Sequence, residues 1–399
     1  MHCTRNVTED VLWVGGDDRR LALFENLFPI PRGVAYNSYL ILDEKTALMD
    51  TVDASITRQF QENVAHGLNG RPLDYLVVNH MEPDHCANIG ELALRYPGMK
   101  IVGNAKTLQF ISQFYDMDLE GRTVTVKEGD KLSLGRHTLS FVMAPMVHWP
   151  EVMMTYDESA KILFSADAFG TFGALNGNLF SDQTDFDRDG LADARRYYAN
   201  IVGKYGPQVQ AVLKKAAGLE IAMICPLHGP VWREDLGYFI NKYDLWSRYQ
   251  PEDRAVLILY GSMYGDTENA AQVLANLLSE AGVKDVSMYD VSSTDVSYLI
   301  AEAFRCSHIV FAAPTYNNGL YRAMEVALAD MKALNLQNRT IGLIENGSWA
   351  PQAGRIMREM LESMKDMRVA QPLVTIRSAL KEEQTAQLSA LRDALIADL

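Results

Sequence analysis

Beyond residue 250 the chain alternates strictly between short apolar segments and amphipathic helical segments. A parallel strand needs a long crossover connection to reach its neighbour, and a helix is the usual crossover. The alternation therefore predicts a doubly wound parallel sheet over residues 251–399. Five apolar segments supply its strands, and each is followed by a helical pattern: AVLILYG, VSMYDV, SHIVFAAP, TIGLIEN and QPLVTIR.

The first 250 residues have a less regular rhythm. Helical patterns at 55–68 and 106–115 fall between only some of the apolar strands, which predicts a mixed α/β sandwich rather than a βαβ series. A chain of 399 residues exceeds the size that one core usually serves. The polar segment QPEDR, residues 250–254, is the expected boundary, giving domains 1–250 and 251–399. The expected strands are YNSYLILD, KTALMDTV, DYLVVNH, KIVGN, HTLSFVMAP, KILFSADAF and IAMICPLH.

Composition excludes several classes of function. The formal net charge of -14 would repel a phosphate backbone, so we expect no nucleic-acid partner. No apolar run is long enough to cross a bilayer, and the N-terminal MHCTRNVTEDVLW lacks the features of a secretion signal, so we expect a cytoplasmic protein without membrane contact. No CxxC pair is present, which predicts reduced thiols rather than disulfides or a rubredoxin-type iron site, at Cys3, Cys86, Cys225 and Cys306.

Side chains that bind metals are concentrated in NHMEPDH, residues 79–85, directly after an apolar strand. Alternate positions of an extended loop point the same way, which would place His80, Glu82 and Asp84 on one side. Alone, the string also fits a charged, solvated turn. Three later strands repeat the pattern, because each is followed by one histidine or carboxylate: His148, Asp167 and His228. The repetition favours a metal site at the strand ends.

A second constellation begins with LYGSMYGDTEN, residues 259–269, where a strand runs into a helix. Such a loop directs backbone N–H groups at one point, and Ser262 and Thr267 add hydroxyl donors. The sequence has neither the lysine-containing loop of triphosphate sites nor GxGxxG, so a monophosphate fits better than a triphosphate or a dinucleotide.

Two further loops, AAPTYNNG at 312–319 and ENGSWAPQAG at 345–354, follow parallel strands and would meet the phosphate loop at the same sheet edge. Flavodoxin-like sheets hold FMN at that edge. Tyr316 and Trp349 could stack on the flavin ring, and neighbouring polar groups could bind its edge. The residues predicted to contact FMN are Ser262, Met263, Tyr264, Gly265, Asp266, Thr267, Pro314, Thr315, Tyr316, Asn317, Asn318, Gly319, Asn346, Gly347, Ser348 and Trp349.

The order HxExDH, His, Asp, His resembles the metallo-β-lactamase fold, with Glu82 standing where the hydrolases of that superfamily usually have histidine. A carboxylate there favours redox-active iron over zinc. Together with a flavodoxin-like second domain, the chain resembles the flavodiiron proteins, or A-type flavoproteins. The resemblance implies that His80, Glu82 and His148 hold one iron, that Asp84 and His228 hold the other, and that Asp167 bridges them. It leaves His85 outside the ligand set.

What the resemblance implies is an oxidoreductase in which FMN passes electrons to a diiron centre that reduces O2 to water, NO to N2O, or both. A rubredoxin or a reduced deazaflavin would donate the electrons, and a head-to-tail homodimer, or a dimer of such dimers, would bring the cofactors together. Two other hypotheses stay open: a metal-dependent hydrolase with an accessory flavodoxin module, and a flavin-only electron carrier. For Tyr197 and Tyr198, in a segment similar to the family's tyrosine-bearing segment, we expect core packing.

Overall fold

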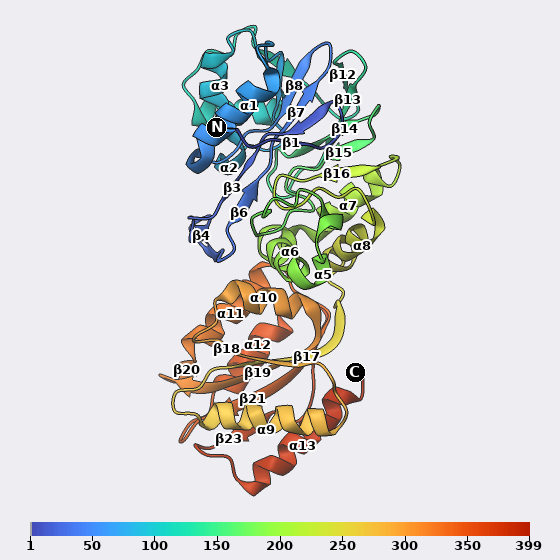
Figure 1. Ribbon diagram of the computed structural model, residues 1–399. Coiled ribbons are helices and arrows are strands. Elements are labelled where there is room, and N and C mark those ends of the chain that lie inside the picture. Colours follow the sequence, from blue (N-terminus) through green and yellow to red (C-terminus); the bar gives the residue numbers. More distant parts are fainter. Residues whose placement is uncertain (1) are drawn as a thin grey trace. The chain divides into compact units, whose positions relative to one another are not determined.

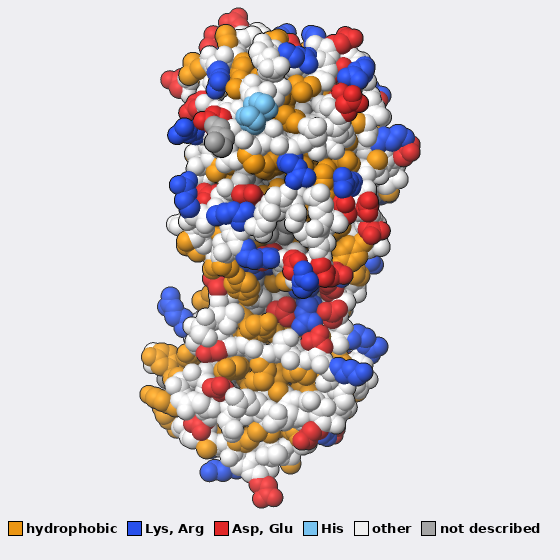
Figure 2. Space-filling model, viewed as in Figure 1, with side chains coloured by type: hydrophobic (Ala, Val, Ile, Leu, Met, Phe, Trp, Pro, Cys, Tyr) orange, Lys and Arg blue, Asp and Glu red, His pale blue; other side chains and the backbone are white. Residues whose placement is uncertain are grey.

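The computed structural model describes residues 2–399, which separate into two compact units (Figure 1). The first unit contains the residues up to Tyr198 together with Pro207–Asp244, and the second contains Ala199–Gly206 and Leu245–Leu399. The boundary after residue 250 stays a prediction. Within residues 2–399 we find no helix with the length and apolarity needed to cross a membrane. Figure 2 shows acidic and basic side chains interspersed over the visible face.

Two sheets packed face to face form the first unit. Side chains from both sheets, such as Tyr39 and Val102 on one and Phe141 and Phe164 on the other, share one buried apolar cluster. The first sheet runs β1 (Arg5–Asn6), β2 (Val11–Trp13), β7 (Tyr39–Leu42), β8 (Thr46–Met49), β9 (Tyr75–Val77), β10 (Lys100–Gly103), β11 (Thr123–Thr125). The second runs β12 (Lys131–Ser133), β13 (Thr138–Met143), β14 (Met153–Asp157), β15 (Ile162–Phe164), β16 (Met223–Cys225).

Short ribbons and helices complete this unit. Asp53 caps the turn that leads into α1, and Asn69 ends that helix in the left-handed conformation, with φ of 45°. The ribbons are β3 (Gly16–Asp18) with β6 (Val34–Tyr36) and β4 (Leu23–Phe24) with β5 (Phe28–Pro29). The helices are α1 (Thr57–Leu68), α2 (Pro83–Cys86), α3 (Ile89–Arg95), α4 (Ala105–Phe114), α5 (Phe186–Asp189), α6 (Leu191–Tyr197) and, for most of their length, α7 (Gly206–Ala216) and α8 (Leu236–Ser247).

The second unit is built on the predicted parallel sheet. Its strand order is β18-β17-β19-β21, with β22 and β23 both pairing with β21, and these pairs are all parallel. The strands are β17 (Asp253–Tyr260), β18 (Val286–Asp290), β19 (Cys306–Tyr316), β21 (Arg339–Asn346), β22 (Met367–Val369) and β23 (Val374–Ile376), and β20 (Gly319–Leu320) pairs with β19 antiparallel. The helices are α9 (Asp266–Glu280), α10 (Val296–Arg305), α11 (Arg322–Ala333), α12 (Ala353–Glu362) and α13 (Glu382–Ile396).

The apolar faces of α9 and α13 explain how one side of this sheet is covered. Ala270 and Leu274 of α9 and Leu388 and Leu391 of α13 lie in one buried cluster with sheet residues such as Val310. Because the chain passes from β17 outward to β18 and then back to β19, the strand order reverses beside β17. Ligands of open parallel sheets bind at the carboxyl ends of the strands at such a point.

Candidate functional site

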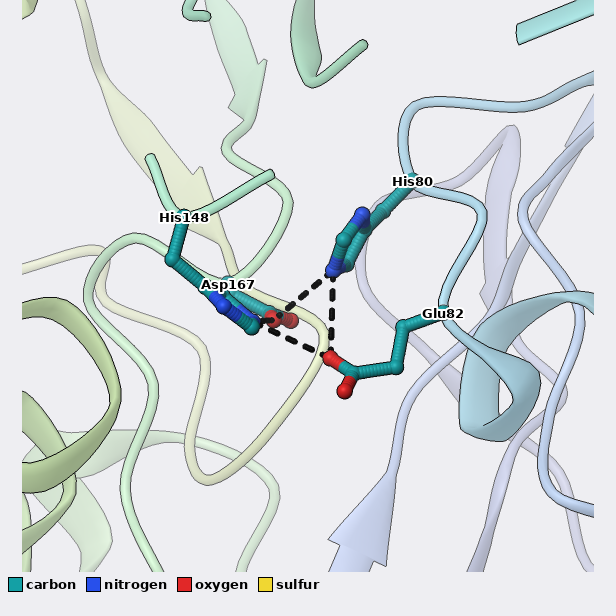
Figure 3. Close-up of side chains that lie close together, drawn as sticks. All are labelled: His80, Glu82, His148 and Asp167. Carbon is teal, nitrogen blue, oxygen red and sulfur yellow. Dashed lines mark hydrogen bonds and ion pairs between the residues drawn. The ribbon is translucent and has the colours of Figure 1, made fainter. Parts of the chain in front are cut away.

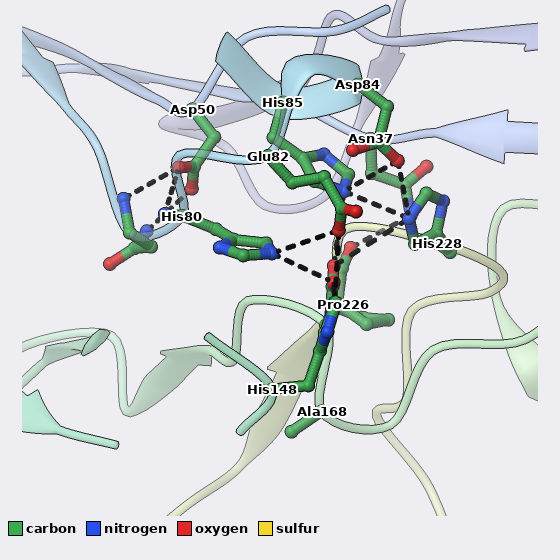
Figure 4. A network of polar contacts seen from close by, with 12 residues as sticks. Asn37, Asp50, His80, Glu82, Asp84, His85, His148, Ala168, Pro226 and His228 are labelled. Atoms are coloured by element: carbon green, nitrogen blue, oxygen red, sulfur yellow. Dashed lines mark hydrogen bonds and ion pairs between the residues drawn. The ribbon is translucent and has the colours of Figure 1, made fainter. Parts of the chain in front are cut away.

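Metal-capable side chains from four strand ends meet in the first unit (Figure 4). His80 follows β9, His148 lies between β13 and β14, Asp167 follows β15, and His228 follows β16. All six predicted metal ligands are brought together. They form two groups, each with ligand atoms within 4.8 Å of one another: His80, Glu82, His148 and Asp167 in one, and Asp84, His85 and His228 in the other.

The first group surrounds one oxygen of Glu82 and one of Asp167 (Figure 3). Glu82 Oε2 lies 3.0 Å from His148 Nε2 and 3.3 Å from His80 Nε2. Asp167 Oδ2 lies 3.1 Å from His148 Nε2 and 3.4 Å from His80 Nε2. Two imidazoles and two carboxylates thus converge on one point, which is a donor set suited to iron.

The second group faces the other oxygen of Asp167. Asp84 Oδ2 lies 3.2 Å from His85 Nε2 and 3.3 Å from His228 Nε2, and those two nitrogens are 2.9 Å apart. Asp167 Oδ1 lies 3.1 Å from His85 Nε2 and 3.7 Å from His228 Nε2. One carboxylate therefore directs one oxygen at each group, which is the arrangement that a ligand bridging two cations requires.

His85 differs from the expectation, because it points into the site. The backbone is extended as far as Glu82, and α2 then begins at Pro83. Side chains therefore alternate in direction only up to Glu82. Within this short helix Asp84 and His85 are adjacent, and both reach the second group. An imidazole is thus added to the side of the site that the sequence had left with Asp84 and His228.

Unpaired buried atoms show that this cluster fits cations. Both oxygens of Asp84 and Oδ1 of Asp167 have no hydrogen-bond partner within residues 2–399. His85 and His228 are 0% exposed, and Nδ1 of His85 also has no hydrogen-bond partner within the described residues. Buried carboxylates and imidazoles in this state are costly unless a metal ion takes up their lone pairs.

Mutual attraction within the cluster determines its charge state. Burial raises the pKa of Glu82, but hydrogen bonds with His148 and His80 outweigh burial and lower the pKa to about 2. Burial lowers the pKa of His148, yet Asp167 and Glu82 raise it to about 9. A cation that binds here displaces protons from imidazoles while the carboxylates are already ionised.

Hydrogen bonds to the far sides of the imidazoles fix their orientation. His80 Nδ1 lies 2.8 Å from Glu151 Oε1, and His228 Nδ1 donates to the Ala35 carbonyl at 2.8 Å. Glu151 is 1% exposed and also accepts from the Met81 N–H at 2.9 Å. These contacts leave both Nε2 atoms for the centre, as is usual for histidines that bind metals.

Asp50 holds the loop from behind (Figure 4). Its carboxylate accepts from the Asn79 N–H at 2.7 Å, from Asn79 Nδ2 at 2.7 Å and from the His80 N–H at 3.2 Å. Burial raises the pKa of Asp50 to about 6, although these donors oppose the shift. The backbone of His80 is therefore fixed before any ligand binds.

Sequence reasoning missed three residues at this site. Glu151 follows His148 by only three positions, and that short spacing was the one available signal. Tyr197, expected to be core packing, is fully buried, but its ring lies 5.4 Å from that of His228 and its hydroxyl has no partner within residues 2–399. Glu25, between β4 and β5, has its pKa raised to about 8 by burial and by Glu82. Nothing in the sequence distinguishes Glu25 from an ordinary turn residue.

The loops predicted to hold a flavin line one pocket of about 510 Å³ in the second unit. Of the predicted contacts, all except Gly265 and Gly319 belong to its lining, to which Ala350 and Ser378 are added. Gly265 has φ of 98° and Gly319 lies in β20, so both shape the loops rather than the pocket wall. Thr315 Oγ1 accepts from the N–H groups of Gln352 and Ala353, which joins the second loop to the third.

The pocket fits FMN in size and in its chemistry. Its volume lies within the roughly 300–1,000 Å³ typical of small-molecule sites. Hydroxyls of Ser262 and Thr267 lie at the N-terminus of α9, whereas aromatic side chains stand on the rim, where Trp349 is 86% and Tyr264 93% exposed. Polar donors for a phosphoryl group and apolar faces for a ring are thus both present.

Comparison with known proteins also divides the chain into a metal-site domain and a flavodoxin-like domain. A family model described as ODP family beta lactamase matches residues 34–229, and one described as Flavodoxin matches residues 258–390. A nitric oxide reductase of Moorella thermoacetica is 32% identical over 375 residues, 93% of this chain and 92% of the relative. An anaerobic nitric oxide reductase flavorubredoxin of Aeromonas hydrophila is 32% identical over 372 residues, 92% of this chain and 74% of the relative.

Solved structures show the same likeness over nearly the whole chain. The rubredoxin oxygen:oxidoreductase of Desulfovibrio gigas has a TM-score of 0.92 at 29% identity, covering 99% of this chain and 98% of that one. The flavodiiron protein of Giardia intestinalis has a TM-score of 0.91 at 26% identity, covering 99% and 97%.

Fold and site together define a protein with a metallo-β-lactamase-like metal domain followed by a flavodoxin-like domain, which confirms the predicted fold class. The chain belongs to the flavodiiron protein family.

Proposed function

We propose that this protein is an oxidoreductase that passes electrons from FMN to a non-haem diiron centre, where NO is reduced to N2O, O2 to water, or both. The observation that carries the proposal is Asp167, whose two oxygens face two separate groups of ligands. Relatives named nitric oxide reductase and rubredoxin oxygen:oxidoreductase support both substrates. A hydrolase is disfavoured, because Glu82 replaces the imidazole that zinc hydrolases of this fold use.

For the ligand set, we assign His80, Glu82 and His148 to one iron, Asp84, His85 and His228 to the other, and Asp167 to both. The two irons would supply electrons to a bound diatomic molecule, and FMN would renew them singly or in pairs. Glu151 holds the ring of His80, and the Ala35 carbonyl holds that of His228. The unpartnered hydroxyl of Tyr197 is available to donate a hydrogen bond to a molecule bound at the centre.

Metal and flavin analysis tests this assignment. The proposal requires about two irons and one FMN per chain, whereas the hydrolase would carry zinc and the simple carrier would carry flavin alone. His85→Asn tests the seventh ligand separately. We expect this variant to keep one tightly held iron and to release the other to a chelator, and unchanged retention of both irons would exclude His85 from the ligand set.

Substrate preference is tested by rapid mixing. The protein is reduced anaerobically with a rubredoxin-type donor or a reduced deazaflavin, the two donors we propose, and mixed with NO and with O2 separately. Turnover with each gas supports the proposal in full. Turnover with neither gas, in a protein that carries both cofactors, overturns it.

A head-to-tail homodimer is the assembly that we propose. Exposed apolar side chains support it on both units: Tyr264, Tyr316 and Trp349 on the rim of the flavin pocket, and Leu23 and Leu27 around the β4–β5 turn that carries Glu25. Groups of exposed apolar side chains are common at contact sites, and a two-fold axis would join each pocket rim to the metal domain of the other chain.

Complementation between defective chains tests this assembly. An Asp167→Asn chain is mixed with a Ser262→Ala, Thr267→Ala chain, and subunits are allowed to exchange. If electrons cross between chains, mixed dimers regain about one working site each. If no mixture regains activity although exchange is shown by labelled subunits, the head-to-tail arrangement is wrong.

A further inference from the structure

Asn346 connects three loops of the flavin pocket. It is the last residue of β21 and 7% exposed. Its Nδ2 donates to Thr267 Oγ1 at 3.3 Å and to the Ser378 carbonyl at 2.8 Å, while its Oδ1 accepts from the Ser378 N–H at 3.0 Å. All polar atoms of this amide are therefore engaged by protein, and Asn346 acts on a ligand through the residues it holds.

The bond to Thr267 determines which way that hydroxyl faces. Because Thr267 Oγ1 receives a proton from Asn346, its own proton must point elsewhere. Thr267 is 2% exposed and lines the pocket at the start of α9. Ser262 is fixed in the same sense, since its Oγ accepts from the Gly265 N–H at 3.0 Å. In each case one lone pair is occupied and the hydroxyl proton is directed away from that donor, so the hydroxyl can donate to a ligand.

Asn346 also fixes a loop that the sequence pattern did not mark as part of the pocket. Ser378, after β23, has a left-handed backbone with φ of 67°, which serine adopts rarely, and its N–H and carbonyl are both held by Asn346. Its Oγ lies 2.8 Å from Ser348 Oγ, and both serines line the pocket. One hydroxyl of that pair donates to the other, so one proton remains for a ligand.

No cation compensates a phosphoryl group in this pocket. Among the described residues that line it, the only charged side chain is that of Asp266, which repels an anion. Recognition of a phosphoryl group must then rely on neutral hydrogen-bond donors. Such donors favour FMN over a flavin without phosphate most strongly when their directions are fixed in advance.

We propose that Asn346 is a positioning residue that makes this pocket select a phosphorylated flavin. It directs the proton of the Thr267 hydroxyl away from itself, so that this proton can be donated to a ligand, and it holds Ser378, the partner of Ser348. This inference rests on the proposed FMN site.

The test compares FMN with riboflavin, which lacks the phosphoryl group, on the full chain freed of flavin. Binding is followed by quenching of flavin fluorescence. In Asn346→Asp the new carboxylate accepts the proton of Thr267, which removes a donor and adds a negative charge. We expect about 100-fold weaker FMN binding and riboflavin binding within about threefold of the wild type, because charge-assisted bonds are worth roughly one to two powers of ten each.

A second variant tests the same role if Asn346→Asp does not fold. Ser378→Gly removes the hydroxyl, and glycine adopts the φ of 67° without strain. Ser348 keeps its own proton but loses the hydrogen bond that fixes its direction, so FMN binding should weaken about tenfold and riboflavin binding should be unchanged. As a charge control, Asn276→Asp, at an exposed position of α9 outside the pocket lining, should leave both affinities unchanged.

The affinities of the wild type and of the variants separate the role of Asn346 from the existence of the FMN site. If the wild type prefers FMN and both Asn346→Asp and Ser378→Gly keep the full preference, the role of Asn346 is disproved while the FMN site stands. If the wild type binds FMN no better than riboflavin, the phosphate site itself is wrong, and this inference falls with it.

Discussion

Protein encloses the metal centre, whereas exposed side chains surround the flavin pocket. His80, His85 and His228 are 0% exposed, but Tyr264 is 93% and Trp349 86% exposed. The metal ligands follow strand ends and are held from behind by buried groups, while the flavin contacts lie on four loops joined mainly by Asn346 and Thr315. The first site is organised before its ligand arrives, and the second is left open at its rim.

Because the two sites lie in different units, each should be emptied without disturbing the other. The largest effect is expected from Asp167→Asn. A neutral amide bridges two cations poorly, so most of the iron and nearly all gas reduction should be lost while FMN stays bound. Metal analysis and flavin absorbance check both results on one sample. A variant with two irons and full activity would show that Asp167 does not bridge.

The converse variant empties the flavin pocket. Ser262→Ala together with Thr267→Ala removes two preset donors, each worth about 1.5 to 3 kcal/mol when bonded to a charged group. The protein should purify with depleted FMN and a normal iron content. Unchanged FMN affinity would place the phosphoryl group elsewhere in the pocket.

A smaller effect is expected where the metal centre is supported from behind. Glu151→Gln keeps the shape of the side chain but weakens its hold on His80, so iron affinity should fall about 10- to 100-fold. Competition with a chelator measures the change. Gln109→Glu, on the surface helix α4, is the matched control and should retain iron like the wild type. If Glu151→Gln binds iron as tightly as the wild type, Glu151 serves only in core packing.

The smallest expected effect is on the folding stability of the metal domain, at His137, outside the metal-ligand cluster. A hydrogen bond with Asp157 at 2.5 Å raises the pKa of His137, which also lies 3.4 Å from Asp10. Since the folded pKa is raised, the stabilisation is fully present below the unfolded value of about 6.5 and is lost as pH rises through the folded value. His137→Gln should therefore be destabilised by about 1 kcal/mol at pH 6 and by less at pH 9 in urea titrations. An equal loss at both pH values would show that the ion pair contributes nothing.

The sequence indicates which side chains lie together in the first unit, because His80, His148, Asp167 and His228 each follow an apolar strand and neighbouring strand ends meet. The resemblance left His85 outside the ligand set, but its side chain lies with those of Asp84 and His228, because the helix that starts at Pro83 presents Asp84 and His85 to the same group. Glu151 and Ser378 escape prediction for another reason. Their roles depend on contacts across 71 and 32 residues of chain, to His80 and Asn346, and local spacing does not report such contacts.

In the proposed mechanism, electrons leave FMN through the metal centre. We would reduce wild type and Asp167→Asn anaerobically, mix each with NO, and follow flavin absorbance in a single turnover. NO is preferred to O2 here because reduced flavins react with O2 without a metal. If NO is a substrate, we expect the flavin to be reoxidised rapidly in the wild type, with N2O formed, and to stay reduced in Asp167→Asn. Equally fast reoxidation in both proteins would contradict this mechanism.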